Sequence, residues 1–371
     1  MPSVHYTKLV QYAKALDPFG RQALGVFAST IGNPNRFGIR LDERSIGETA
    51  QVFEINGASH YIAVNAEILG TKIAVAVEMS KRDWENRRKY FNGIGEDTAN
   101  TSLNDLVGVG AQPFAYLPTI NLGGDDIIKD EEIVHGLLQG YLKAANDAGV
   151  VIPGGETGIV RGIVFPEQMD LAGASMGIIM PKSRFCYSDR VELGDLLYGL
   201  RADGPHANGF TAIRRIADKL PHGYFTELSS GRNWGEAVLE PTPSYAGVVN
   251  AMLNEGVEIH YLQPITGHGI RKIARSKKDF VYKIDYFPEM PEVFKFIQKH
   301  ANIGDKEMLA TYNSGVGFVI YTPHGNEKEI ISIAEGFGME AFRMGQVEEG
   351  TRQINVKPLG IIFSTEDIAK G

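Results

Sequence analysis

The placement of glycine is the feature that most limits how this chain can fold. The chain holds 43 glycines, concentrated where apolar, β-branched runs end and helical patterns begin. Loops of this kind, which join strands to helices over a sheet, are typical of α/β and α+β proteins. At 371 residues the chain exceeds the roughly 250 to 300 residues that one hydrophobic core serves, so we expect two domains. The polar, turn-rich stretch 181–195 divides the chain into residues 1–180 and 181–371.

Apolar periodicity predicts the elements within each half. Residues 61–79 are expected to form two buried strands around a turn at Gly70. In 131–149, apolar side chains at helical spacing predict a helix that stops at Gly149. The other predicted elements are a short strand in 150–158, strands at 169–180, 196–200 and 314–322, a helix carrying Ile213, Ile216, Ala217 and Leu220, and a helix within 243–256.

Composition and charge exclude several classes of protein. Apolar residues make up 43% and charged residues 22%, so the chain should fold throughout. The net charge of -8 argues against a DNA-coating protein, which needs a basic surface, and we expect no nucleic-acid partner. The single cysteine, Cys186, excludes an intramolecular disulfide and fits a reducing compartment. The sequence has no apolar N-terminal segment and no apolar run near about 18 residues, so we expect a cytoplasmic protein with no membrane partner.

The loop RADGPHANGF (201–210) is the first candidate site. It joins a predicted strand to a predicted helix, and a glycine-bearing turn there leaves backbone N–H groups free at the helix N-terminus, where an anion is favoured. Asn208 is placed to cap that helix, and His206 lies at its mouth. The alternative is an ordinary surface turn with an incidental histidine.

Two aspartates mark a second candidate site, GIGEDTANTSLNDLVGVGAQP (93–113). Asp97 and Asp105 are eight residues apart, so on a helix they would lie about 12 Å apart along the axis and could not share one metal ion. They could contact different parts of a magnesium-bound triphosphate, because Mg²⁺ takes one or two carboxylates plus phosphate oxygens. The alternative is structural, with Asp97 as N-terminal helix charge and Asp105 as a second cap.

A lysine and two glycine turns give weaker signals. Lys72 is a positive charge within an apolar, strand-like stretch, and a buried lysine needs an anion, so a carboxylate or a ligand phosphate should lie nearby. GGETG (154–158) places Glu156 where glycines let a ligand approach closely, although many such turns are only tight turns. ITGHGI (265–270) puts His268 in a third glycine turn.

Common nucleotide and hydrolase motifs are absent from the sequence. It contains no GxxxxGKS P-loop, no GxGxxG that opens a helix after a strand and no HExxH zinc signature. GASMG (173–177) fits the letters GxSxG, but it lies inside the strand predicted at 169–180 and not at the strand-to-helix turn of a nucleophile elbow. A conventional NTPase, dehydrogenase, zinc protease or α/β hydrolase is therefore disfavoured.

The order of the candidate pieces resembles a known family. The most specific pieces are NDLVGVGAQP (104–113), GGETG with MDLAG (169–173), and GDLLYGLRADGPHANGF (194–210). GTK precedes them, and LEPT, ITGHG and a strand entered through NSGVG follow. In this order they are similar to aminoimidazole ribonucleotide synthetases, also called phosphoribosylformylglycinamidine cyclo-ligases, over about residues 60–350.

The resemblance implies a fold and a reaction. The fold is α/β (α+β) with two domains, in which an N-terminal mixed sheet with helices dimerises through a shared barrel and a C-terminal α/β domain follows. The reaction is the ATP- and Mg²⁺-dependent ring closure of purine biosynthesis. ATP activates the formyl oxygen of formylglycinamidine ribonucleotide as a phosphate, and a neighbouring nitrogen displaces it, releasing aminoimidazole ribonucleotide, ADP and phosphate. Such chemistry depends on positioning and charge neutralisation.

Matching positions imply the site residues. Lys72 should contact ATP phosphates, Asp97 and Asp105 should hold Mg²⁺ or order its waters, and His206, Asp105 and Lys72 are the implied catalytic groups. The implied nucleotide-binding positions are Lys72, Asp97, Asp105, Gly155, Glu156 and Thr157. The implied substrate-binding positions are Gly204, His206, Asn208, Gly209, Thr266 and Gly267.

Several stretches differ from the family pattern. The usual DGVGTK is EILGTK (67–72), the third glycine of TGGG is His268, and RKIAR (271–275) stands where ENxPR is expected. The upstream glycine-rich loop has no clear equivalent. Two alternatives therefore stay open: another ATP-dependent small-molecule phosphotransferase of the same superfamily, and a non-catalytic nucleotide-binding regulator with this fold.

Overall fold

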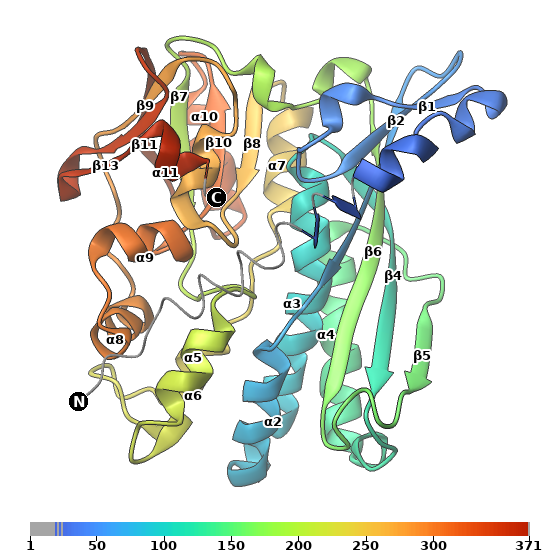
Figure 1. Ribbon diagram of the computed structural model, residues 1–371, viewed down its shortest axis with the longest axis vertical. Coiled ribbons are helices and arrows are strands. Elements are labelled where there is room, and N and C mark those ends of the chain that lie inside the picture. The colour runs from blue at the N-terminus through green and yellow to red at the C-terminus, as the bar shows by residue number, and fades with distance from the viewer. Residues whose placement is uncertain (1–18, 21, 24, 370–371) are drawn as a thin grey trace.

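Two sheets organise the computed structural model of this protein (Figure 1). The structure describes residues 19, 20, 22, 23 and 25–369, so the first 18 residues of the predicted N-terminal domain lie outside the described part. Across that described part, no helix combines the length and the apolar character needed to cross a membrane.

The first sheet is mixed and belongs to the N-terminal half. Its strand order is β1-β2-β3-β6-β4-β5, and all neighbours are antiparallel except β4 and β5. Helix α3 packs on one face of this sheet, and α2 and α4 pack against α3 (Figure 1). The elements are β1 (Ile39–Leu41), β2 (Gln51–Ile55), β3 (Tyr61–Ile68), α2 (Lys72–Arg82), α3 (Arg87–Val107), β4 (Gln112–Leu122), α4 (Glu131–Ala148), β5 (Glu156–Ile159) and β6 (Met169–Ile179).

The second sheet belongs to the C-terminal half. Its order is β13-β12-β9-β11-β7-β10-β8, with β9 and β12 as the parallel pair. Its strands are β7 (Leu196–Arg201), β8 (Tyr261–Pro264), β9 (Phe280–Ile284), β10 (Val316–Thr322), β11 (Ala341–Glu349), β12 (Gln353–Val356) and β13 (Ile361–Phe363). Its helices are α5 (Phe210–Ala217), α6 (Trp234–Val238), α7 (Ala246–Asn254), α8 (Glu292–Ala301), α9 (Asp305–Thr311), α10 (Glu327–Gly336) and α11 (Thr365–Ile368).

The expected α/β architecture is confirmed, together with most predicted elements. Helix α4 begins after Asp130, whose carboxylate accepts hydrogen bonds from two backbone N–H groups, and ends at Gly149, which is left-handed at φ 70°. Strands β6, β7 and β10 and helices α5 and α7 form where the periodicity predicts them. The first sheet ends at Ile179 and the second begins at Leu196, while a boundary between residues 180 and 181 stays a prediction.

The second strand predicted within 61–79 is wrong. Strand β3 ends at Ile68, and after the turn at Gly70 (φ 71°) the chain enters helix α2. The β-branched residues of KIAVAVEM favour a strand, but α2 is buried on more than one side, between α3 and α6. Its contact with α6 is so close that a Cβ added to Gly235 would lie 2.2 Å from the sulfur of Met79. Burial on several sides removes the one-sided pattern that identifies most helices.

The short strand predicted in 150–158 lies further along the chain than expected. Val151 makes only an isolated bridge to Ala115. Strand β5 begins after the glycine turn, because its parallel register with β4 starts where Glu156 pairs with Thr119. The glycines therefore precede the strand rather than end it.

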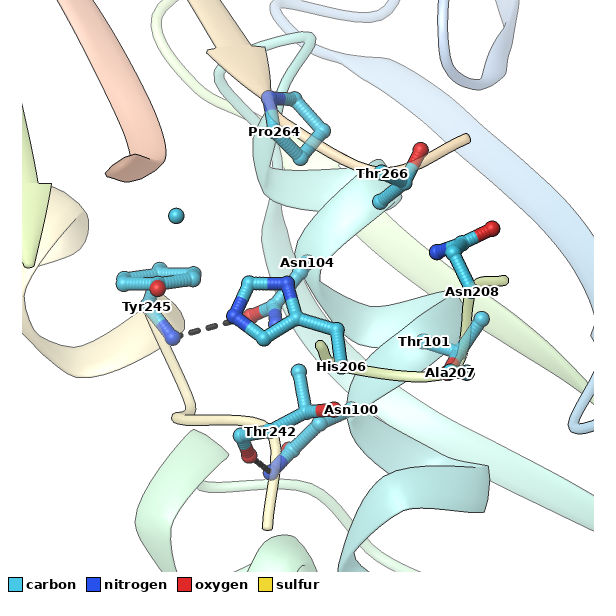
Figure 2. A pocket seen from close by; sticks show the side chains of 11 residues that line it. Asn100, Thr101, Asn104, His206, Ala207, Asn208, Thr242, Tyr245, Pro264 and Thr266 are labelled. Atoms are coloured by element: carbon cyan, nitrogen blue, oxygen red, sulfur yellow. Dashed lines mark hydrogen bonds between the residues drawn. The ribbon is translucent and has the colours of Figure 1, made fainter. Parts of the chain in front are cut away.

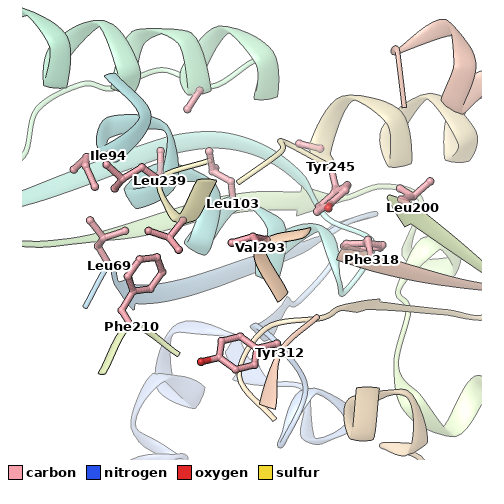
Figure 3. Close-up of a cluster of buried hydrophobic side chains, with 14 of the residues drawn as sticks. Leu69, Ile94, Leu103, Leu200, Phe210, Leu239, Tyr245, Val293, Tyr312 and Phe318 are labelled. Atoms are coloured by element: carbon pink, nitrogen blue, oxygen red, sulfur yellow. The ribbon is translucent and has the colours of Figure 1, made fainter. Parts of the chain in front are cut away.

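One hydrophobic core joins the two halves. Its largest cluster contains Leu69, Ile94 and Leu103 from the N-terminal half together with Leu200 and Phe318 from the C-terminal half (Figure 3). Smaller clusters lie within the second sheet and beneath the outer strands of the first. Because side chains of both halves pack in one cluster, apolar burial holds the two domains in one arrangement.

Glycines set the close approach of α3 and α4. A Cβ atom at Gly95 would lie 2.3 Å from the carbonyl oxygen of Leu137, and one at Gly140 would lie 2.0 Å from that of Asn92. Neither backbone can move away without separating the two helices, so both positions require glycine.

We expect Gly140→Ala to lower the free energy of unfolding by about 1–3 kcal/mol, because α3 and α4 would have to separate. The matched control is Gly336→Ala in α10, where an added Cβ meets nothing within 4 Å. That change should keep or raise stability, since alanine favours a helix over glycine by about 1 kcal/mol. Urea unfolding measures both variants, and equal stability of the two would contradict the packing described.

Candidate functional site

Helix α3 carries polar side chains into the interior of the molecule. Asp97, Asn100 and Asn104 are buried and follow one another at three and four residues, which places them on one face of the helix. That face binds the backbone of segment 240–245, which connects α6 to α7. The hydrogen bonds run from Thr242 N to Asp97 (2.8 Å), from Asn100 to Thr242 O (2.8 Å), from Asn104 to Pro243 O (2.9 Å) and from Tyr245 N to Asn104 (2.9 Å).

A buried ion pair closes one end of this face. Lys72 Nζ lies 2.6 Å from Asp97 Oδ2, and both side chains have zero exposure. Lys72 also donates to the carbonyl of Glu240 (2.8 Å), and the hydroxyl of Thr242 donates to Asp97 (2.5 Å). The expectation that a buried Lys72 needs an anion is therefore confirmed, and the anion is a carboxylate of the protein.

The pairing defines what Lys72 and Asp97 can do in this conformation. Both are enclosed by α2, α3 and segment 240–245, so neither faces open solvent. Asp97 and Asp105 both lie inside α3, whose N-cap is Asn86, so the structural alternatives of N-terminal charge and second cap are wrong. The structure does not bring the two aspartates to one point, since eight residues of helix separate them by about 12 Å.

A small cavity lies between α3 and the C-terminal domain (Figure 2). It is enclosed tightly enough to hold about one water molecule. The loop after β7, segment 240–245 and the residues after β8 close it on the C-terminal side. Its lining residues are Asn100, Thr101, Asn104, His206, Ala207, Asn208, Thr242, Tyr245, Pro264, Thr266 and Gly317.

His206 projects into this cavity rather than lying at an open mouth (Figure 2). The residue is only 3% exposed and has a left-handed backbone (φ 55°), a conformation in which histidine is enriched among non-glycine residues. Among the described residues, its Nε2 has no hydrogen-bond partner. Burial, helped by the charge of Lys72, lowers the pKa of His206 to about 3, so the imidazole is neutral near pH 7.

Asn208 does not cap α5, so that prediction is wrong. The N-cap is Gly209, which is left-handed at φ 77° and makes no side-chain cap bond. A Cβ at Gly209 would lie 2.1 Å from the ring of Tyr312, so the position requires glycine. Asn208 faces Gly267 instead, where an added Cβ would lie 3.1 Å from its Oδ1. The structure thus brings Asn208, Thr266 and Gly267 together at the cavity.

Asp105 lies close to an acid of strand β3. Its carboxyl contacts that of Glu67, and its Oδ1 is buried without a hydrogen-bond partner among the described residues. Burial, together with the neighbouring carboxyl of Glu67, raises the pKa of Asp105 to about 7 against the opposing charges of Lys272 and Arg275. Burial also raises the pKa of Glu67. Two carboxyl groups in contact, one of them with an unsatisfied oxygen, form a pair suited to a cation.

Lys272 approaches this pair from the C-terminal domain. It lies on the 3-10 helix Gly269–Ala274, is half-buried, and donates through Nζ to the hydroxyl of Thr266. Burial lowers its pKa, and the charges of Asp105 and Glu67 oppose that shift. Glu67 and Lys272 are site residues that the sequence prediction missed. The available signals are the acid kept in EILGTK and the basic substitution in RKIAR.

The GGET turn lies at the edge of the first sheet. Glu156 and Thr157 are exposed on β5, and a Cβ at Gly155 would lie 2.3 Å from the carbonyl of Pro118. Register across the sheet aligns Glu156 with Thr119, Ala172 and Ile68 in turn. Three strand spacings, roughly 14 Å, therefore separate the GGET turn from the end of β3 that carries Glu67.

Known proteins match this chain over both halves. Residues 47–179 match the family described as AIR synthase related protein, N-terminal domain, and residues 192–356 match its C-terminal domain. Phosphoribosylformylglycinamidine cyclo-ligase of Methanococcus vannielii is 30% identical over 300 residues, 80% of each chain. That of Pyrococcus horikoshii is 30% identical over 302 residues, 81% of this chain and 83% of the other.

Solved structures share the fold at low identity. A HypE–HypF complex structure aligns with a TM-score of 0.60 at 16% identity, covering 87% of this chain and 95% of the other. A thiamine-monophosphate kinase from Stenotrophomonas maltophilia gives 0.57 at 18% identity, covering 87% and 92%. AaThiL complexed with AMPPCP and TMP gives 0.55 at 14% identity, covering 84% and 88%. With both halves matched in order, this chain belongs to the AIR synthase related protein family.

Proposed function

We propose that this protein is an ATP-dependent ligase that converts formylglycinamidine ribonucleotide to aminoimidazole ribonucleotide, ADP and phosphate. The observation that carries the proposal is the 30% identity over 300 residues to a phosphoribosylformylglycinamidine cyclo-ligase. A match of that length includes residues of both domains, and the candidate site is built from both.

Glu67 and Asp105 are the residues that would hold Mg²⁺. Their carboxyls are in contact, and the buried Oδ1 of Asp105 lacks a partner among the described residues, which is the condition a divalent cation would relieve. When bound, Mg²⁺ neutralises phosphate charge during transfer. Of the predicted metal ligands Asp97 and Asp105, this assignment retains Asp105. It replaces Asp97 with Glu67, because the carboxylate of Asp97 pairs with Lys72 and accepts a hydrogen bond from Thr242 N.

The remaining predicted residues divide into contact and positioning roles. We propose that His206, as a neutral imidazole, hydrogen-bonds the substrate near the group that is activated, with Asn208 and Thr266 beside it. Gly204, Gly209 and Gly267 keep the loops close enough for backbone contact. Lys72 and Asp97 position segment 240–245. Gly155, Glu156 and Thr157 would contact the nucleotide along the row that runs across the sheet from Ile68.

Product analysis tests the reaction. Purified protein given ATP, Mg²⁺ and formylglycinamidine ribonucleotide should release ADP and aminoimidazole ribonucleotide in equal amounts. ADP without the imidazole product would favour another phosphotransferase. ATP binding by calorimetry without turnover would favour a nucleotide-binding regulator. The absence of both ADP and aminoimidazole ribonucleotide from the reaction would overturn the proposal.

Three substitutions distinguish residues proposed to contact the ligands from residues that position segment 240–245. Asp105→Asn and His206→Ala should each lower kcat at least about tenfold, a loss of about 1.4 kcal/mol in the transition state, with little change in thermal unfolding. Asp97→Asn should instead lower the free energy of unfolding by about 3–5 kcal/mol, because it leaves the buried Lys72 unpaired. Exposed Asp218→Asn is the control for both measurements. An unchanged kcat in both of the first two variants would contradict the site.

We further propose that two copies associate through the outer face of the first sheet. On β3 and β6 most residues facing away from α3 are apolar and half-buried, with Asp170 as a charged exception, and Phe114 on β4 is 42% exposed. Large contiguous apolar patches on a protein surface usually mark contact sites. The half-buried apolar residues of β3 and β6 on this face are Ile62, Val64, Ala172, Ala174, Met176 and Ile178.

Light scattering after gel filtration tests this dimer. The wild-type protein should run as a dimer, and Val64→Lys, at the centre of that face, should shift it toward the monomer by placing a charge in the contact. Thr211→Lys on the exposed surface of α5 is the control and should leave the dimer intact. A wild-type monomer at micromolar concentration would contradict the proposal.

We also propose that the protein acts in the cytoplasm. Its one cysteine, Cys186, is a buried free thiol, which fits a reducing compartment.

A further inference from the structure

Two lysines reach the interior near α3, and their surroundings differ. Lys72 is fully paired, with the carboxylate of Asp97 at 2.6 Å and the carbonyl of Glu240 at 2.8 Å. Lys272 donates to a single neutral hydroxyl, that of Thr266. Within the described part of the chain, no carboxylate oxygen lies within 4.0 Å of Lys272 Nζ in an ion pair.

The protein satisfies this ammonium group only in part. A cation that is withdrawn partly from water is stabilised by an ion pair and by hydrogen bonds from its N–H groups. Lys272 has three N–H donors, and one of them is used. Asp105 and Glu67 lie within electrostatic range of Lys272 but outside ion-pair distance. The unused donors therefore have room for acceptors that the protein does not supply.

A second unsatisfied group lies at the cavity that Thr266 lines. The hydroxyl that contacts Lys272 belongs to a residue that also lines the cavity into which His206 points (Figure 2). His206 is 3% exposed, and its Nε2 has no partner among the described residues. Two polar groups of the same domain, the half-buried Lys272 and the buried His206, thus lie near Thr266. Both face the acids and amides of α3 in the other domain.

We propose that Lys272, rather than Lys72, is the lysine that binds a phosphate oxygen at the interdomain site. The inference rests on the proposed function and specifies its anion-binding group. A divalent cation held by Glu67 and Asp105 forms a neutral set, so Lys272 gives the site the net positive charge that a phosphate group requires. The phosphate could belong to the nucleotide or to the ribonucleotide substrate, and both sources offer the same oxygens.

Calorimetric titration with two probes tests the inference and distinguishes the sources. Wild-type protein, Lys272→Met, Lys272→Arg and Lys277→Met are each titrated with Mg-ADP and with ribose 5-phosphate. Lys277 is the matched control, because it is an exposed lysine five residues along the same segment. Lys272→Met should weaken binding of one probe by about tenfold to hundredfold, the range for a lost charge-assisted hydrogen bond. Lys272→Arg should retain most of the affinity, and Lys277→Met should match the wild type.

Thermal unfolding of the ligand-free variants separates phosphate binding from a structural role. Lys272→Met should keep or raise the Tm of the free protein, since it removes a half-buried charge that lacks an ion pair. A drop in Tm together with lost binding would show that Lys272 only supports the loop, and would overturn the inference. If Lys272→Met bound both probes with wild-type affinity, the inference would also be overturned, but the proposed function would stay intact. A wild-type protein that binds neither probe would overturn the proposed function and the inference together.

Discussion

The buried pair of Lys72 and Asp97 is the interaction on which the site depends. It joins the start of α2 to the middle of α3, and through Glu240 and Thr242 it fixes segment 240–245 of the other domain. Two charges without exposure are tolerated only because each has further hydrogen bonds. The pair therefore contributes less as a source of stability than as a constraint on where the second domain lies.

The rest of the site follows from that constraint. Once segment 240–245 lies along α3, Asn100 and Asn104 bind its backbone, and Tyr245 comes next to the ring of His206 at 6.2 Å between centroids. Polar side chains that would destabilise an isolated core helix are thus satisfied from across the domain boundary. Asp105 Oδ1 and His206 Nε2 are among the buried polar atoms of the described residues that have no hydrogen-bond partner, and the proposed ligand site is built around these two.

The two domains contribute different charged and polar groups to the candidate site. The N-terminal domain supplies the carboxyls of Glu67 and Asp105, and the C-terminal domain supplies His206, Thr266 and Lys272. The residues proposed to bind a cation and those proposed to bind an anion thus lie on opposite sides of one interface. The shared apolar core keeps that interface in place without requiring the ligand. An acidic chain can bind phosphate in this way, because the net charge of -8 says nothing about one enclosed interdomain site.

Local sequence determined a large part of this protein. Apolar periodicity and glycine stops gave α4, β6, β7 and β10, and the ordered motifs gave the two-domain α/β architecture and the loop with His206 and Asn208. Tertiary structure alone decided which groups meet. Burial on several sides made a helix of the β-branched stretch after Gly70. Packing of α2 against α3 within the N-terminal domain paired Lys72 with Asp97, and Asp105 came to lie near Glu67 of the same domain and Lys272 of the other. Apolar periodicity shows only which side of one segment faces the core and which faces solvent. The contacts of the site join residues from different segments of the chain. Their protonation depends on burial in the folded protein, which no local pattern records.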